Sequence, residues 1–157
     1  MRNEEQDIVV IGLGNQLRND DGAGLEVARR LKLTLPHGRV ITECDDPLAI
    51  IAAWENAHTA VVLDALRSNS PPGSIHRFEA NEHPLPRHFA RCSSHGQGLP
   101  DAVELARALG LLPRRLIVYA IEGQDFGKGS DLSPAVAVAT NETVARVANE
   151  LAELRGA

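Results

Sequence analysis

The sequence predicts a single α/β domain of three layers, in which helices flank a twisted, mostly parallel sheet of about five strands. Three apolar runs at residues 8–11, 59–65 and 116–121 have the length and composition of strands that are buried on both faces. Segments with helical periodicity separate these runs, and such alternation is typical of a doubly wound sheet. The chain of 157 residues has the usual size of one domain, so we assign residues 1–157 to it.

The elements between the first two apolar runs follow from local signals. A stripe of Leu25, Ala28 and Leu31 indicates a helix that stops before Pro36. Residues 38–43 resemble a short strand.

Proline and glycine mark the later helices. Asp46 can cap a second helix, with Pro47 at its first position. A third helix lies between Pro100 and Gly110, and a long final helix starts near Pro134.

The region between the second and third apolar runs is more polar. Residues 74–79 suit a strand at the edge of the sheet, and residues 81–88 are predicted to form an exposed loop.

Charge and cysteine usage exclude several classes of protein. The formal net charge of −5 argues against a nucleic-acid-binding surface. The sequence has no apolar run of 18 residues and no signal-peptide pattern at its start, so we expect a cytoplasmic protein without membrane insertion. Cys44 and Cys92 lack the C-x-x-C spacing and are interpreted as free thiols.

The turn after the first apolar run carries glycines and acids, a combination that suggests a binding site. Gly12 and Gly14 begin a dinucleotide-binding pattern, but Leu17 stands where that pattern needs a third glycine. Asp20 and Asp21 would also repel a phosphate at the start of the following helix. A phosphate site is therefore not expected here.

Two interpretations of this acidic turn remain open. Asn19, Asp20 and Asp21 could simply cap the helix, which is a common role for these residues. Alternatively, Asp21 meets Asp64, since both follow apolar strands whose carboxyl ends meet at the same edge of a parallel sheet. With His95 from a glycine-rich loop, they could form a metal site of two carboxylates and one imidazole.

Other hydrolytic motifs are missing or incomplete. The sequence contains neither H-E-x-x-H nor G-x-S-x-G. Cys92 and His95 could form a thiolate–imidazole couple, although a spacing of three residues does not establish that geometry.

Several ordered motifs resemble those of the hydrogenase maturation proteases, the endopeptidases that process the large subunit of nickel–iron hydrogenases. The resemblance extends over most of the chain and rests on four segments: Gly12-Leu13-Gly14-Asn15 with Asp20-Asp21-Gly22-Ala23-Gly24, Leu63-Asp64-Ala65 with Pro72-Gly73-Ser74-Ile75, Ser93-Ser94-His95 with Gly98-Leu99, and Gly123 through Leu132-Ser133-Pro134.

This resemblance implies a function and a set of ligands. By motif, Asp21, Asp64 and His95 correspond to the residues with which the family binds nickel already mounted in the substrate. The implied reaction removes the C-terminal extension of a nickel-loaded large-subunit precursor by a monomeric enzyme. Zinc or cadmium could replace nickel in crystals. No general base is assigned.

The chain departs from the family pattern at two places. Residues 43–47 replace a glycine- and threonine-rich turn, and Gln124 replaces a frequent proline. Asp45 or Asp46 could line the same crevice, although Asp46 is better interpreted as a helix cap.

Two competing functions remain open at this stage. Residues 12–15 are similar to the start of peptidyl-tRNA hydrolases, but the expected histidine is missing and the net charge of −5 opposes tRNA binding. A non-enzymatic chaperone for nickel or for a hydrogenase precursor could use the same site residues.

Overall fold

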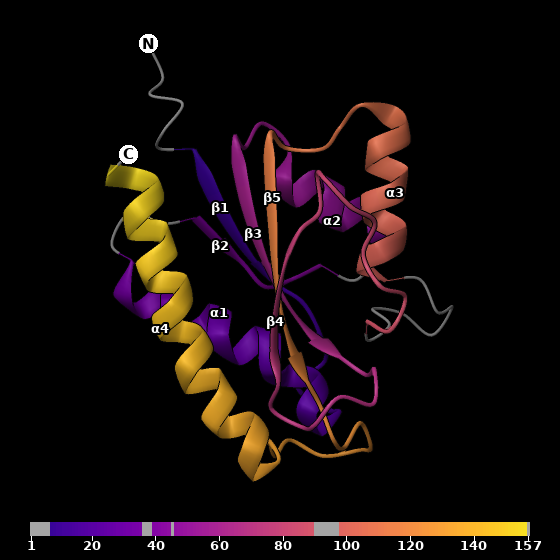
Figure 1. Cartoon of the computed structure of the whole chain (residues 1–157), viewed down its shortest axis with the longest axis vertical. Helices are drawn as coiled ribbons and strands as arrows, with labels where there is room; N and C mark the ends of the chain where they lie inside the picture. Colours follow the sequence, from indigo (N-terminus) through magenta and orange to yellow (C-terminus); the bar gives the residue numbers. More distant parts are fainter. Residues whose placement is uncertain (1–6, 36–38, 45, 90–97, 157) are drawn as a thin grey trace.

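A five-stranded sheet between two helical layers forms the framework of the protein (Figure 1). The structure is a computed structural model that describes residues 7–35, 39–44, 46–89 and 98–156. In chain order its elements are β1 (Ile8–Gly12), a 3-10 turn η2 (Asn19–Gly22), α1 (Ala23–Thr34), β2 (Arg39–Ile41), α2 (Pro47–Trp54), β3 (Thr59–Leu66), β4 (Ile75–Glu79), α3 (Leu99–Leu109), β5 (Arg115–Glu122) and α4 (Pro134–Gly156). The predicted fold class is confirmed.

The strands are arranged in the order β2-β1-β3-β5-β4. The first three pairings are parallel, and β4 runs antiparallel to β5 at one edge. This position confirms the edge strand predicted for residues 74–79. Among the described residues no helix is both long and apolar enough to cross a membrane.

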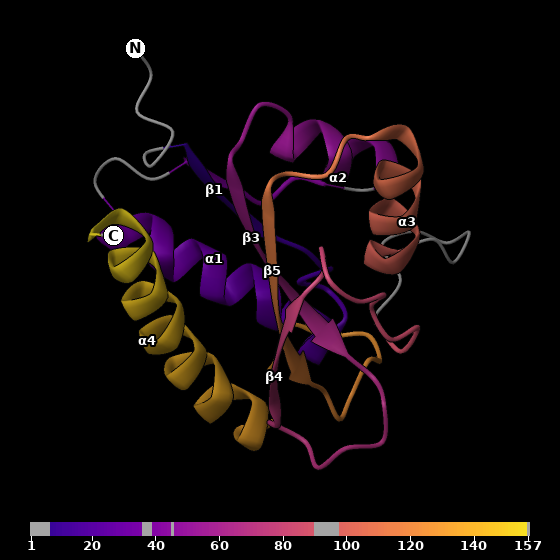
Figure 2. The same ribbon diagram turned by 45° about the horizontal axis from the view of Figure 1, so that its top comes forward.

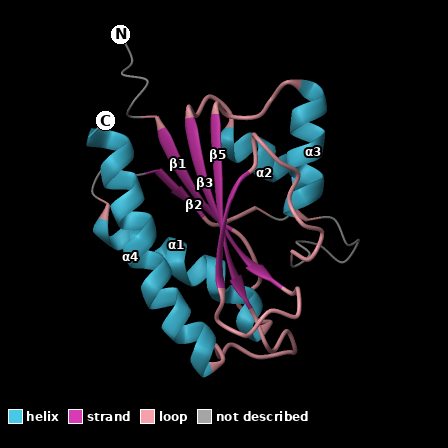
Figure 3. Ribbon diagram, in the orientation of Figure 1, coloured by secondary structure: helices cyan, strands magenta, loops and turns pink. Residues whose placement is uncertain are grey.

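Alternate side chains of the central strands fill two separate cores. Val9, Val62 and Val118 pack toward α2 and α3, whereas Val10, Val61 and Ile117 pack toward α1 and α4. Figures 2 and 3 show α1 and α4 on one face of the sheet and α2 and α3 on the other. Because both faces are covered, the strands are apolar over most of their length, which is why they were visible in the sequence.

The predicted helix boundaries have identifiable causes in the structure. Asp46 Oδ1 accepts a hydrogen bond from Ala49 N at 2.8 Å, so the predicted cap of α2 is confirmed. Gly110 ends α3 in the left-handed conformation, with φ of 69°.

Candidate functional site

The carboxyl ends of β1 and β3 form the point where the winding of the sheet reverses. From β1 the chain continues through α1 to β2 on one side, whereas from β3 it continues to β4 and β5 on the other side. Doubly wound folds bind their ligands outside the strands at such a point. Asp21 lies in η2 just after β1, and Asp64 lies in β3, so both reach this place.

Asp64 is buried inside the strand instead of standing at its end. We expected β3 to finish at this carboxylate, but the ladder with β5 continues to Leu66. Oδ1 of Asp64 accepts a hydrogen bond from Ala65 N at 2.8 Å, and Oδ2 has no partner among the described residues. Burial raises the pKa of the Asp64 carboxyl well above its ordinary value, and the negative charge of Asp21 raises it further.

Asp21 presents a second carboxylate oxygen without a partner. Its Oδ2 accepts a hydrogen bond from Asn15 N at 3.0 Å, whereas its buried Oδ1 has no partner in the described part of the chain. Burial raises the pKa of Asp21, although the Asn15 hydrogen bond and the charge of Arg18 oppose this shift. The site therefore holds two adjacent acids, each with one oxygen available to a cation.

Two glycines of the first motif are required by close packing around these acids. A Cβ on Gly14, whose φ is 125°, would lie 1.9 Å from the backbone oxygen of Asp21. A Cβ on Gly24 would lie 2.4 Å from the backbone oxygen of Leu63. The glycines thus allow η2 and α1 to approach the residues that bear the carboxylates.

The helix-cap interpretation of the acidic turn is wrong. Gly22 occupies the N-cap position of α1, and no side chain caps either α1 or η2. Asp20 instead reaches the segment before α4, where its carboxylate accepts hydrogen bonds from the backbone N–H groups of Gln124, Asp125 and Ser133. Burial alone would raise the pKa of Asp20, but these bonds and one from the Ser133 hydroxyl outweigh it and lower the pKa.

A cavity of about 260 Å³ adjoins Asp21. Its other lining residues are basic or aromatic: Arg18, Arg67, Arg87, His88, Phe89 and Phe126. Sequence reasoning missed this cavity because residues 81–88 were assigned to an exposed loop. Nothing in their local pattern shows that they return to the end of β3.

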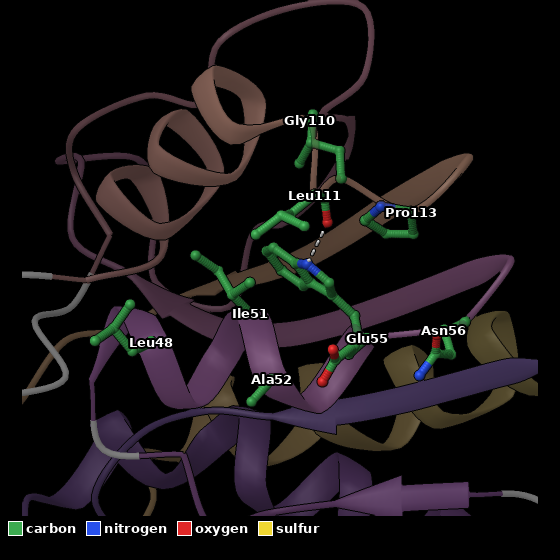
Figure 4. Close-up of a pocket in the computed structure, with 11 residues that line it drawn as sticks. Leu48, Ile51, Ala52, Glu55, Asn56, Gly110, Leu111 and Pro113 are labelled. Atoms are coloured by element: carbon green, nitrogen blue, oxygen red, sulfur yellow. Dashed lines mark hydrogen bonds between the residues drawn. The ribbon is translucent and has the colours of Figure 1, made fainter.

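A second cavity of about 430 Å³ lies away from the carboxylates (Figure 4). It is bordered by α2 and by the loop from Gly110 to Pro113, next to the amino ends of β3 and β5. Trp54 Nε1 donates a hydrogen bond to the backbone oxygen of Leu111 at 3.1 Å and so ties α2 to that loop. Parallel α/β sheets bind ligands at the carboxyl ends of their strands, so the cavity beside Asp21 is the better candidate.

The third predicted ligand, His95, lies outside the described residues, as does Cys92. Within the ranges that the structure covers, no group of three or more His, Cys, Asp and Glu side chains is placed to hold a metal. Asp21 and Asp64 are therefore the two described members of the predicted set, and the ligand role of all three residues stays a prediction.

Comparisons with known proteins identify the class to which this fold and site belong. The family model described as hydrogenase maturation protease matches residues 36–150. Hydrogenase expression/formation protein HoxM of Azotobacter vinelandii is 30% identical over 144 residues, which cover 84% of this chain and 70% of that protein. HupD of Rhodobacter capsulatus is 27% identical over 150 residues, which cover 92% of this chain and 70% of that protein.

Solved structures agree with this assignment. The [NiFe] hydrogenase maturation protease HybD from Thermococcus kodakarensis is 26% identical, with a TM-score of 0.72 and coverage of 92% of this chain and 97% of that one. The maturating endopeptidase HybD from E. coli matches in fold, with a TM-score of 0.78 at 20% identity and coverage of 93% and 92%.

The chain belongs to the hydrogenase maturation protease family, and it is an endopeptidase of hydrogenase maturation. This assignment favours the protease over the peptidyl-tRNA hydrolase and over a non-enzymatic chaperone.

Proposed function

We propose that this endopeptidase removes the C-terminal extension of a nickel–iron hydrogenase large-subunit precursor after nickel has been inserted. Nickel arrives in the substrate, and Asp21, Asp64 and His95 bind it as a recognition signal. The enzyme acts as a cytoplasmic monomer, and its substrate is the folded, metal-loaded precursor.

The observation that carries this proposal is a pair of buried carboxylate oxygens, Asp21 Oδ1 and Asp64 Oδ2, that have no hydrogen-bond partner among the described residues. Burial raises the pKa of both acids, and the charge of Asp21 raises that of Asp64 further, so the two are unfavourable as anions unless a cation lies between them. Asp20, only one residue away, has hydrogen-bond donors for both of its oxygens. The contrast supports a ligand role for Asp21 and Asp64 and a structural role for Asp20.

The donor set suits a borderline divalent ion such as nickel. Carboxylate oxygens alone favour harder ions, whereas an imidazole nitrogen from His95 would favour nickel, zinc or iron. Three protein ligands leave coordination positions for groups of the substrate. A metal held by so few ligands binds weakly without the substrate, which is consistent with its arrival as part of the precursor.

The test compares nickel-loaded and nickel-free precursor with the same enzyme preparation, using mass spectrometry to detect the shortened large subunit. We expect cleavage of the loaded precursor only. An unstructured peptide that spans the cleavage site should be a poor substrate. Efficient cleavage of nickel-free precursor would disprove recognition through nickel, and failure to cut either form would contradict the proposed substrate.

A further inference from the structure

The cavity beside Asp21 is basic in a protein whose formal net charge is −5. Three arginines and one histidine line it, and Asp21 is the acid among its described lining residues. Such a concentration of positive charge next to a site for a cation is not explained by the binding of the metal.

The end of β3 assembles this cavity. Arg67 directly follows the strand, and its backbone N–H donates to the backbone oxygen of His88 at 2.7 Å. Leu66 forms an antiparallel bridge with Phe89. These contacts hold residues 87–89 beside the chain that leaves the site at Asp64.

Phe126 positions two of the guanidinium groups. The Arg67 guanidinium carbon lies 5.3 Å from the centre of the Phe126 ring, and Arg18 Nε donates to the Phe126 backbone oxygen at 3.2 Å. Within the described ranges, the Arg67 guanidinium makes no hydrogen bond or salt bridge. Arg67 is thus oriented by an aromatic face while its donors remain available.

Arg18 and Arg87, the other two arginines of the cavity, are less suited to a test of its function. Arg18 is near enough to Asp21 for their charges to interact, so it also serves as a counter-charge for that acid. The Arg87 side chain is 80% exposed, and its one ion pair among the described residues, 3.5 Å to Asp101, contributes little energy. Arg67 is therefore the residue on which the function of the cavity can be tested.

We propose that this cavity binds a carboxylate of the substrate's C-terminal extension and that Arg67 is its specificity-determining residue. This inference rests on the proposed function, in which the substrate is a polypeptide. The anionic groups of a polypeptide are carboxylates, and a guanidinium binds a carboxylate with two parallel hydrogen bonds. The metal-bearing part of the precursor occupies the aspartates, so the adjacent cavity receives the chain that continues from it.

Two sources of this carboxylate can be separated by changing the substrate. In one precursor the acidic side chains of the extension are replaced by their amides. In a second, a few neutral residues are added after the last residue, which moves the terminal carboxylate away. A rise in KM for only one of these precursors identifies the source.

The enzyme variants are Arg67→Gln, Arg67→Lys and the matched control Arg155→Gln, which lies exposed near the end of α4. With the unmodified nickel-loaded precursor we expect Arg67→Gln to raise KM about tenfold with little change in kcat, Arg67→Lys to have an intermediate effect, and the control to match the wild type. With the precursor that lacks the recognised carboxylate, wild type and Arg67→Gln should be equal. An unchanged KM in Arg67→Gln, or an equal loss with every precursor, would overturn the proposal.

A binding measurement keeps this test independent of cleavage. A synthetic extension peptide is titrated into wild type and Arg67→Gln, and NMR follows the arginine side-chain N–H signals. We expect about tenfold weaker binding to Arg67→Gln and no effect of Arg155→Gln. If the wild type binds the peptide through Arg67 but leaves the loaded precursor uncut, the proposed function fails while the carboxylate site stands. If the loaded precursor is cut and neither its cleavage nor peptide binding depends on Arg67, the carboxylate site fails while the proposed function stands.

Discussion

Asp20 and Ser133 are separated by 113 positions in the sequence, yet Ser133 donates to the Asp20 carboxylate through both its backbone N–H and its hydroxyl, each at 2.7 Å. Gln124 N and Asp125 N each donate to the same carboxylate at 2.8 Å. Asp20 therefore connects the turn after β1 to the segment that leads into α4. Adjacent Asp21 keeps one oxygen without a partner in the described part of the chain, so these neighbouring acids have different roles.

Replacement of Asp20 should destabilise the fold. In Asp20→Ala the partly buried donors of Gln124, Asp125 and Ser133 lose their acceptor, and an unsatisfied donor costs at most about 1–3 kcal/mol when it is shielded from water. We expect the free energy of unfolding, measured in urea, to fall by about 2–4 kcal/mol. The control Asp131→Ala removes an exposed carboxylate and should change it by less than about 0.5 kcal/mol. Equal stability of the two variants would show that Asp20 does not secure this segment.

Replacement of Asp64 should abolish activity without destabilising the fold. Burial and the charge of Asp21 both disfavour its ionised form, so Asp64→Asn relieves an unfavourable interaction in the absence of substrate. We expect an unchanged or higher melting temperature together with loss of precursor processing. Calorimetry and mass spectrometry of the same preparation check both results. A stable variant with full activity would remove Asp64 from the functional site.

The sequence was sufficient for the fold because its signals were local. Strands covered on both faces are apolar over most of their length, and Asp46 with Pro47 marks a helix start without reference to distant residues. The sequence also predicted that Asp21 and Asp64 lie at the same end of the sheet, since the carboxyl ends of its parallel strands meet there.

What the sequence could not show depended on contacts between distant segments. Asp20 has the composition of a helix cap, but four hydrogen bonds from beyond residue 123 outcompete that local role. The contacts of Arg67 likewise come from two distant segments: His88 lies in the segment predicted to be an exposed loop, and Phe126 follows β5.

His95→Ala should abolish activity without loss of the fold. Removal of the imidazole would leave two carboxylates, which favour harder ions than nickel. We expect processing of the nickel-loaded precursor to fall sharply, while circular dichroism and the melting temperature resemble those of the wild type. An unfolded variant would indicate a structural role, and full processing would exclude His95 as a ligand.

A cluster at the edge of the sheet should make stability depend on pH. Glu150 of α4 accepts hydrogen bonds from Arg77 of β4 and Tyr119 of β5. Burial tends to raise the pKa of Glu150, but these bonds outweigh it and lower the pKa; burial and the bond to Glu150 raise the pKa of Tyr119 to about 12. The pKa of Glu150 is therefore lower in the folded state than in the unfolded state. The stabilisation of the fold by ionised Glu150 is present above the unfolded-state pKa and is lost as the pH falls through the folded-state pKa.

Unfolding of Glu150→Gln across a range of pH checks this dependence. Near pH 7 we expect the variant to be less stable than the wild type by about 0.5–1 kcal/mol, a value that allows for solvent screening of the partly exposed Arg77. The difference should shrink as the pH approaches about 3. A difference that stays constant with pH would attribute the loss to packing alone.

Gly24→Ala should connect helix packing to the functional site. Alanine in place of glycine normally stabilises a helix by about 1 kcal/mol. Here the added Cβ would lie 2.4 Å from the backbone oxygen of Leu63 and 2.9 Å from the Cα of Asp64, so α1 or β3 must shift. We expect the free energy of unfolding in urea to fall by about 1–3 kcal/mol and processing to be reduced, because the shift moves the Asp64 carboxylate.

The control is the same substitution at Gly156, where the new Cβ meets nothing within 4 Å; it should be neutral or slightly stabilising and leave processing unchanged. If both variants behave like Gly156→Ala, the close approach of α1 to β3 does not fix the position of Asp64.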